Sequence, residues 1–113
     1  MKYIVAIIQP DRLDEVLDRL EQKDVHLVTV SSVLGRGRQK GIAEVYRSAK
    51  EAGSLLRKTK LEIAVNDQYV KSVIEAITAG ARTGQIGDGK IFVLDMERCI
   101  RIRTGEEGND AIG

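Results

Sequence analysis

The stretch LEIAVNDQYVKSVIEAI, residues 61–77, decides the fold because its periodicity changes part-way along. Residues 61–65 form a strand-like run of mainly apolar side chains. Apolar residues then recur at the i, i+3, i+4, i+7 spacing of a helix that buries one face. These residues are Val70, Val73, Ile74 and Ile77. Asn66 or Asp67, between the two patterns, has the short polar side chain that caps helix N-termini, so the stretch predicts a strand leading into a helix.

The same strand-to-helix pattern occurs near the N-terminus. Residues 3–8 are strand-like, Asp11 is the expected cap, and a second apolar stripe follows at helical spacing. The stripe consists of Leu13, Val16, Leu17 and Leu20. Further strand-like runs follow the two helices, at residues 27–34 and 91–94. The order of elements is therefore β-α-β, repeated once.

A doubled β-α-β unit in a chain of 113 residues predicts a ferredoxin-like α+β sandwich. Parallel strands joined by a helix take right-handed crossovers, which place both helices on one face of a single sheet. The other face of that sheet would still need cover. We therefore expect a homo-oligomer that packs sheet against sheet.

Composition indicates an ordinary globular domain. A content of 42% hydrophobic and 31% charged residues argues against disorder, and a net charge of +1 gives no general attraction to nucleic acid or membrane. Cys99 is the only cysteine, so no internal disulfide can form and nothing indicates an oxidising compartment. No apolar run approaches the ~20 residues that span a bilayer. We expect a cytoplasmic protein.

The segment TGQIGDGKIF, residues 83–92, matches most of the P-loop pattern but fails two of its requirements. Ile91 stands where a hydroxyl ligand for magnesium is needed, and the helix precedes the strand instead of following the loop. The glycines at 84, 87 and 89 can still turn backbone N–H groups inward around an anion, with Lys90 adding charge. An ordinary glycine-rich turn with a solvated lysine is the alternative interpretation.

Two other basic segments favour the anion-binding interpretation. Residues 35–41, GRGRQKG, form a second loop of glycines and cations, and residues 36–60 hold eight basic and two acidic side chains. Arg101 and Arg103 alternate at period two, which predicts an extended strand with both on one face. Three converging cationic segments would suit a polyanion such as a nucleoside triphosphate.

In their order along the chain, these motifs resemble the PII family of trimeric nitrogen and carbon sensors. The resemblance rests on residues 7–10 (IIQP), 35–41 (GRGRQKG), 46–47 (YR), 61–65 (LEIAV), 81–93 (ARTGQIGDGKIFV) and 100–106 (IRIRTGE). It implies one domain over residues 1–113, with a T-loop at 37–55, a nucleotide-phosphate loop at 82–90 and a C-terminal loop at 102–113. It also implies a homotrimer that binds ATP or ADP in clefts between subunits.

Site residues follow from the resemblance position by position. The implied nucleotide-binding residues are Ile7, Thr29, Gly35, Gly37, Arg38, Glu62, Ala64, Gly87, Asp88, Gly89, Lys90, Arg101 and Arg103. Arg101 and Arg103 would come from the neighbouring subunit, and Thr29, Glu62 and Ala64 would border the adenine. The implied 2-oxoglutarate-binding residues are Gln39, Lys40, Gly41 and Lys58. The keto acid would chelate Mg²⁺ held by ATP and the Gln39 carbonyl, with Lys58 on its distal carboxylate.

The T-loop resembles the arm with which the family contacts its partners, including the ammonium channel. Arg47 matches the arginine that enters the channel mouth, which would recruit the protein to the membrane. Glu51 stands where relatives carry the tyrosine that receives a nucleotide, and Ala49 replaces a serine that some relatives phosphorylate. We therefore expect no uridylylation, and the altered tip leaves the partner open.

Three other functions compete with a nitrogen-status sensor. The first is a divergent PII-like regulator that uses the cleft for another metabolite and controls a carbon-uptake or nitrogen-fixation partner. The second is an ATP-using enzyme, but no cluster of base and nucleophile is evident and His26 is the only histidine. The third is an RNA reader, which would need stacking aromatics on the sheet, whereas the chain has one Phe and three Tyr. We expect neither catalysis nor nucleic-acid binding.

Overall fold

The computed structural model describes residues 1–37 and 55–112 and contains one four-stranded sheet in the order β2-β3-β1-β4. The strands are β1 (Lys2–Ile8), β2 (Thr29–Gly35), β3 (Leu56–Val65) and β4 (Gly89–Asp95). The helices are α1 (Leu13–Gln22), α4 (Val70–Ala81) and the short α5 (Asn109–Ile112). All neighbouring strands are antiparallel. Each β-α-β unit is thus split by a strand of the other, which confirms the predicted ferredoxin-like fold.

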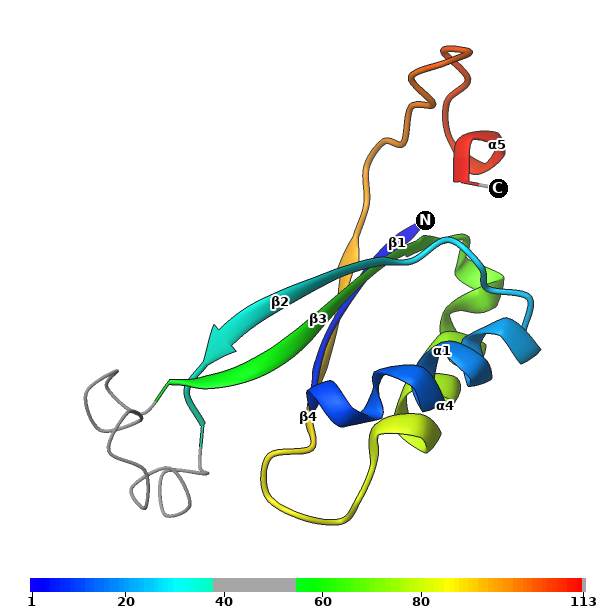
Figure 1. Cartoon of the computed structure of the whole chain (residues 1–113). Helices are drawn as coiled ribbons and strands as arrows, with labels where there is room; N and C mark the ends of the chain where they lie inside the picture. The colour runs from blue at the N-terminus through cyan, green and yellow to red at the C-terminus, as the bar shows by residue number, and fades with distance from the viewer. Residues whose placement is uncertain (38–54, 113) are drawn as a thin grey trace.

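The core lies between one face of the sheet and the two long helices, which cover the same side (Figure 1). Alternate residues of the central strands, such as Ile4 of β1 and its partner Ile63 of β3, are fully buried on this face. Val16 and Leu20 of α1 and Val73 and Ile77 of α4 meet them from the helix side. Each such aliphatic side chain contributes about 1.5–3 kcal/mol on burial, so the periodicity that predicted the helices also builds the core.

The helix starts differ from the prediction. Each long helix is entered through a 3-10 turn, η1 (Pro10–Arg12) or η2 (Asp67–Tyr69), so Asp11 lies inside a turn and Asn66 stands before one. No side chain caps either helix, and the predicted N-caps are wrong. Backbone carbonyls of the 3-10 turns accept hydrogen bonds from the N–H groups at the helix starts instead, as Pro10 does from Leu13 and Asp67 from Val70. Asp67 accepts a hydrogen bond from the N-terminal ammonium at 2.8 Å.

The strand boundaries also shift. β3 begins at Leu56, five residues before the predicted start, and pairs along its whole length with β2 and β1. The predicted extended strand through Arg101 and Arg103 is wrong, because residues 102–104 form a turn. This turn is closed by the bond from the Gly105 amide to the Arg101 carbonyl at 2.7 Å and by a single bridge between Ile100 and Glu107.

The second face of the sheet has no cover among residues 1–37 and 55–112. Phe92 and Leu94 of β4 are 48% and 49% exposed and pair with Val5 and Tyr3 of β1, which point away from the helices. This apolar face is where the predicted oligomer would pack, and the trimer itself stays a prediction. Within the same residues, no helix is both long and apolar enough to cross a membrane.

The two helices approach each other closely at Gly80 of α4. A Cβ added there would lie 2.9 Å from the Val16 Cα and 2.9 Å from its Cγ2. Because the Val16 backbone is part of the contact, a change of rotamer cannot relieve it. Arg12 holds the same helix end by donating from Nε to the Gly80 carbonyl at 2.8 Å.

We therefore predict that Gly80→Ala lowers the free energy of unfolding by about 1–3 kcal/mol, even though alanine is the better helix former. Chemical denaturation followed by circular dichroism measures this change. Gly37→Ala is the matched control, since a Cβ at Gly37 would meet nothing within 4 Å. Equal stability of Gly80→Ala and the wild type would contradict the close helix contact.

Candidate functional site

The candidate phosphate loop joins the end of α4 to the start of β4. Gly84, Gly87 and Gly89 have φ angles of 89°, 107° and 105°, a region that side-chain-bearing residues rarely adopt. At Gly89 the chain also runs against β1, where a Cβ would lie 1.7 Å from the Ile7 carbonyl oxygen. The loop therefore has a defined, glycine-dependent shape, as expected for a backbone that approaches a ligand closely.

Asp88 holds the loop from within. Its Oδ2 accepts hydrogen bonds from the backbone N–H groups of Thr83 at 2.8 Å and Gly84 at 2.9 Å, and the Thr83 hydroxyl donates to its Oδ1. These bonds, the one from the Thr83 side chain first, hold the pKa of the Asp88 carboxyl below its usual 3.8. The stabilisation is therefore present above pH 3.8 and is lost as the pH falls through the lowered pKa.

Lys58 connects the sheet to this loop. It lies on β3 opposite Val33, its exposed fraction is only 7%, and its Nζ donates to the Gly87 carbonyl at 3.4 Å. Burial lowers the pKa of its ammonium group from the usual 10.5. A partly desolvated cation beside a glycine-rich loop is well placed to receive an anion.

Several of the predicted residues meet at this end of the sheet. Lys90 pairs with Ile7 across β4 and β1, on the face away from the helices. Gly35 ends β2 next to Lys58, whose Cγ would lie 3.4 Å from a Cβ at Gly35. Gly37 lies two residues beyond β2. The implied ligand residues Arg38, Gln39, Lys40, Gly41 and Arg47 lie outside the described residues.

The residues expected to border adenine lie further along the same face. Thr29 of β2 pairs directly with Glu62 of β3, and Ala64 follows two residues later. The Tyr3 hydroxyl donates a hydrogen bond to the Glu62 carboxylate, and this bond raises the pKa of Tyr3. The Lys60 Nζ lies 3.8 Å from the Glu62 Oε1. These partners hold the Glu62 side chain on the sheet.

Arg101 and Arg103 do not join this group within one chain, and the resemblance implied that they would come from the neighbouring subunit. β4 runs away from the phosphate loop, and the C-terminal segment lies beyond the opposite end of the sheet (Figure 1). Arg101 is already engaged there, since its Nη1 lies 2.6 Å from Glu106 and its Nη2 donates to the Asp110 carbonyl at 3.0 Å.

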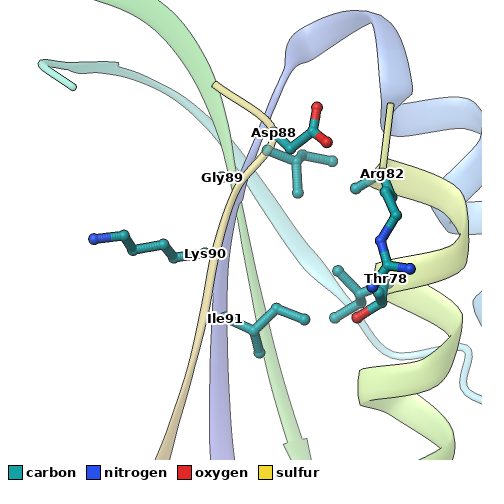
Figure 2. Close-up of a pocket in the computed structure, with 9 residues that line it drawn as sticks. Thr78, Arg82, Asp88, Gly89, Lys90 and Ile91 are labelled. Carbon is teal, nitrogen blue, oxygen red and sulfur yellow. The ribbon is translucent and has the colours of Figure 1, made fainter. Parts of the chain in front are cut away.

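A cleft of about 290 Å³ lies between α4 and the start of β4 (Figure 2). Its lining consists of Ile8, Ile77, Thr78, Ala81, Arg82, Asp88, Gly89, Lys90 and Ile91. Figure 2 shows Ile91 turned toward α4, whereas the Lys90 side chain extends from the other side of the strand. The cleft is therefore on the helix side of the sheet, and Lys90, the lysine expected to bind phosphate, projects from the opposite face.

A second hollow, of about 430 Å³, lies near the end of β3 and was not foreseen from the sequence. Ala64, Asn66, Tyr69 and the C-terminal Ile112 contribute to its lining. The Asn66 Oδ1 is buried without a hydrogen-bond partner among the described residues. Only Ala64 links this hollow with the predicted adenine region.

Comparison with known proteins supports the resemblance that the sequence motifs indicated. The family model for the nitrogen regulatory protein P-II matches residues 1–106. The chain is 53% identical to the nitrogen regulatory protein P-II 2 of Methanothermobacter thermautotrophicus over 112 residues, covering 99% of this chain and 97% of that protein. It is 52% identical to the nitrogen regulatory protein GlnK1 of Methanosarcina mazei over 114 residues, covering 99% and 97% of the two chains.

A solved structure agrees with the fold. The crystal structure of Arabidopsis thaliana PII bound to citrate superposes with a TM-score of 0.80 at 40% sequence identity. The match covers 98% of this chain and 88% of the other. The split β-α-β sheet described above is therefore the architecture of that protein as well.

The contact between Gly89 and Ile7 generates a prediction. We expect Gly89→Ala to destabilise the protein by more than 1 kcal/mol beyond Gly84→Ala, because both sites have positive φ but only Gly89 faces a backbone atom. Gly84→Ala, whose Cβ would meet nothing within 4 Å, is the matched control. Denaturant titration measures both variants, and equal losses would refute the close approach of β4 to β1.

Proposed function

Given that the chain belongs to the PII family of nitrogen regulatory proteins, we propose that it senses adenine nucleotides and 2-oxoglutarate. As a family member it is a signal-transduction protein of nitrogen metabolism and not an enzyme. The finer proposal is that ATP and ADP compete for one cleft. In its ATP-bound form, with Mg²⁺, the cleft then accepts 2-oxoglutarate.

The observation that carries the proposal is the phosphate loop with its two lysines. The loop turns through three glycines at positive φ, Lys90 projects from the face away from the helices, and the Lys58 ammonium contacts the Gly87 carbonyl. Such a combination of exposed loop backbone and converging cations suits phosphate groups. The Arabidopsis relative is described as bound to citrate, itself a polyanion, which supports an anion site in this fold.

The 2-oxoglutarate site would combine Lys58 with residues of the neighbouring loop. The ligand's 1-carboxylate and 2-keto oxygens can chelate Mg²⁺, while its distal carboxylate needs a cation. Lys58 suits that role because it is a largely buried cation beside the phosphate loop, where a carboxylate would stabilise its charged form. Mg²⁺ would be held by the ATP phosphates and by the Gln39 carbonyl, the oxygen donors that this ion prefers.

A homotrimer would complete the cleft. The apolar sheet face with Phe92 and Leu94 is suited to packing against neighbours, and the loop with Arg101 and Arg103 lies at the far end of the sheet from Lys90. These two arginines can therefore meet the phosphates only from another subunit. We propose that each of the three clefts takes its loop from one protomer and its arginines from the next.

We further propose that the ligands reshape the T-loop, residues 37–55, which would act on nitrogen-metabolism partners such as an ammonium transporter. Switching of this kind requires each ligand to bind the two loop states with different affinities. Arg47 is the proposed contact with the transporter, which would recruit a cytoplasmic protein to the membrane. Glu51 lacks a hydroxyl, so no nucleotide can be attached to it and the protein would respond to ligands alone.

The altered loop tip favours one second candidate. Ser48 and Glu51 differ from the family's modification motif, and Ala49 replaces a serine that some relatives phosphorylate, so the tip has a different chemistry for its partner. A regulator of a carbon-uptake or nitrogen-fixation partner, responding to another metabolite in the same cleft, would fit this difference. The two candidates separate on whether 2-oxoglutarate binds.

Isothermal titration of 2-oxoglutarate into protein saturated with Mg-ATP, and then with Mg-ADP, tests the proposal. We expect binding with ATP and none with ADP. Lys58→Met should lower the affinity for 2-oxoglutarate by a factor of at least about ten, because one charge-assisted hydrogen bond is lost. Lys71→Met, at an exposed position of α4, is the matched control. ATP binding without any response to 2-oxoglutarate would reject the first candidate in favour of the second.

Lys58 gives a second, spectroscopic prediction. Because burial lowers the pKa of its ammonium group, a bound carboxylate should raise that pKa again. NMR titration of the lysine side-chain signals, with and without 2-oxoglutarate in the presence of Mg-ATP, measures the change. A Lys58 pKa that does not move when 2-oxoglutarate binds would place the distal carboxylate elsewhere.

A further inference from the structure

We infer that Asp88 is a positioning residue, whose carboxylate clamps the turn formed by residues 83–88 and does not itself contact the nucleotide. The inference rests on the proposed nucleotide function and assigns a separate role within that site. The resemblance implied only that Asp88 belongs to the nucleotide site, whereas the clamp states what its carboxylate does there. The clamp would hold the loop in its phosphate-accepting shape before any ligand arrives.

The contacts of Asp88 account for both carboxylate oxygens. One oxygen accepts from two successive backbone N–H groups, those of Thr83 and Gly84, and the other accepts from the Thr83 hydroxyl. The Thr83 hydroxyl in turn accepts from the Gln85 amide at 3.3 Å. Three residues at the start of the loop are thus tied, directly or through Thr83, to one side chain at its end.

The loop position of this clamp explains its effect on shape. Thr83 lies two residues beyond the end of α4, and Asp88 immediately precedes β4. The clamp therefore joins the end of a packed helix to the start of a paired strand and closes the glycine-rich turn between them. Since glycines at positive φ are conformationally permissive, a fixed turn needs such a restraint from outside the backbone.

The side chains of Asp88 and Lys90 point in different directions, which separates the clamp from the cation proposed to face the ligand. Figure 2 shows the Asp88 carboxylate and the Lys90 ammonium leaving the chain on opposite sides. A carboxylate that faced a polyphosphate would repel it, whereas one that binds the loop's own amides organises the loop at a distance from the charge. The two roles predict opposite signs for the effect of removing the charge.

Four variants test the clamp. Asp88→Asn removes the charge and keeps the size, Thr83→Val removes the hydroxyl at constant shape, and Thr83→Ser restores it. The fourth is the double variant with Asp88→Asn and Thr83→Val. Amide hydrogen exchange of Gly84 in ligand-free protein reports the clamp directly. We expect faster exchange at Gly84 in Asp88→Asn and Thr83→Val, and wild-type exchange in Thr83→Ser.

ATP affinity by calorimetry, with Mg²⁺ and with EDTA, reports the consequence for binding. We expect Asp88→Asn and Thr83→Val each to weaken the affinity for ATP about tenfold in both conditions, since the first removes the charge and one acceptor oxygen of the clamp and the second removes the hydroxyl that donates to it. Thr83→Ser should bind as the wild type does. The double variant should lose less than the product of the two single losses, because both changes break the same interaction.

Three outcomes would overturn the clamp. Tighter ATP binding by Asp88→Asn would show a carboxylate that faces the phosphates, and a loss confined to Mg²⁺ would show a metal ligand. Unchanged Gly84 exchange in both single variants would show that the hydrogen bonds do not hold the loop. Wild-type protein that binds no adenine nucleotide would reject the proposed function instead, while the exchange data would still decide the clamp. The Thr83 pair keeps the test valid even if Asp88→Asn does not fold.

Discussion

The pairing of β1 with both β3 and β4 is the constraint on which the rest of the structure depends. β1 is hydrogen-bonded along its length to a strand on each side. Because side chains alternate between the two faces along a strand, the register with β1 assigns a face to each paired residue of β3 and β4. Ile4, Ala6 and Ile8 go to the helices and are buried. The intervening residues, including Ile7 beside Lys90, are left to the open face.

This division gives the two faces of the sheet different compositions. The helix face supplies the cohesion of the subunit through close packing, which includes the approach of Gly80 to Val16. The open face carries Lys58, Lys90 and Glu62 together with the exposed Phe92 and Leu94. Packing and the proposed ligand chemistry would thus be separated by one layer of backbone, and the loop after α4, which ends at Asp88 and Gly89, connects the two sides.

Much of this arrangement could be predicted from the sequence, because helix and strand periodicity report directly on burial. The two helical stripes located both helices, and the β-α-β order gave the sheet. The N-caps at Asp11 and Asn66 failed because a cap pattern does not distinguish the start of an α-helix from a 3-10 turn that precedes it. The alternation at Arg101 and Arg103 was too short to indicate a strand, and the turn depends on Arg101 contacts with Glu106 and Asp110.

The glycine-rich loop of the candidate site could be located from the sequence, but its geometry could not. The glycines and Lys90 were found from the motif, whereas the contact of Lys58 with Gly87 joins residues 29 positions apart and has no local signature. The clamp between Thr83 and Asp88 left a weak signal, a threonine and an aspartate five residues apart around a glycine. Only the positive φ angles of the turn bring those two side chains together.

The ion pair between Arg101 and Glu106 has a consequence for salt dependence. At 2.6 Å, Glu106 is a resident anion on a guanidinium that is proposed to meet a phosphate, so a ligand exchanges one negative partner for another. Added salt screens the ion pair between Arg101 and Glu106 that the ligand replaces, and it also screens the new contact between Arg101 and the phosphate. The affinity of such a cleft should therefore fall less steeply with added salt than its number of cations suggests. The C-terminal turn would then buffer the site against the ionic conditions of its surroundings.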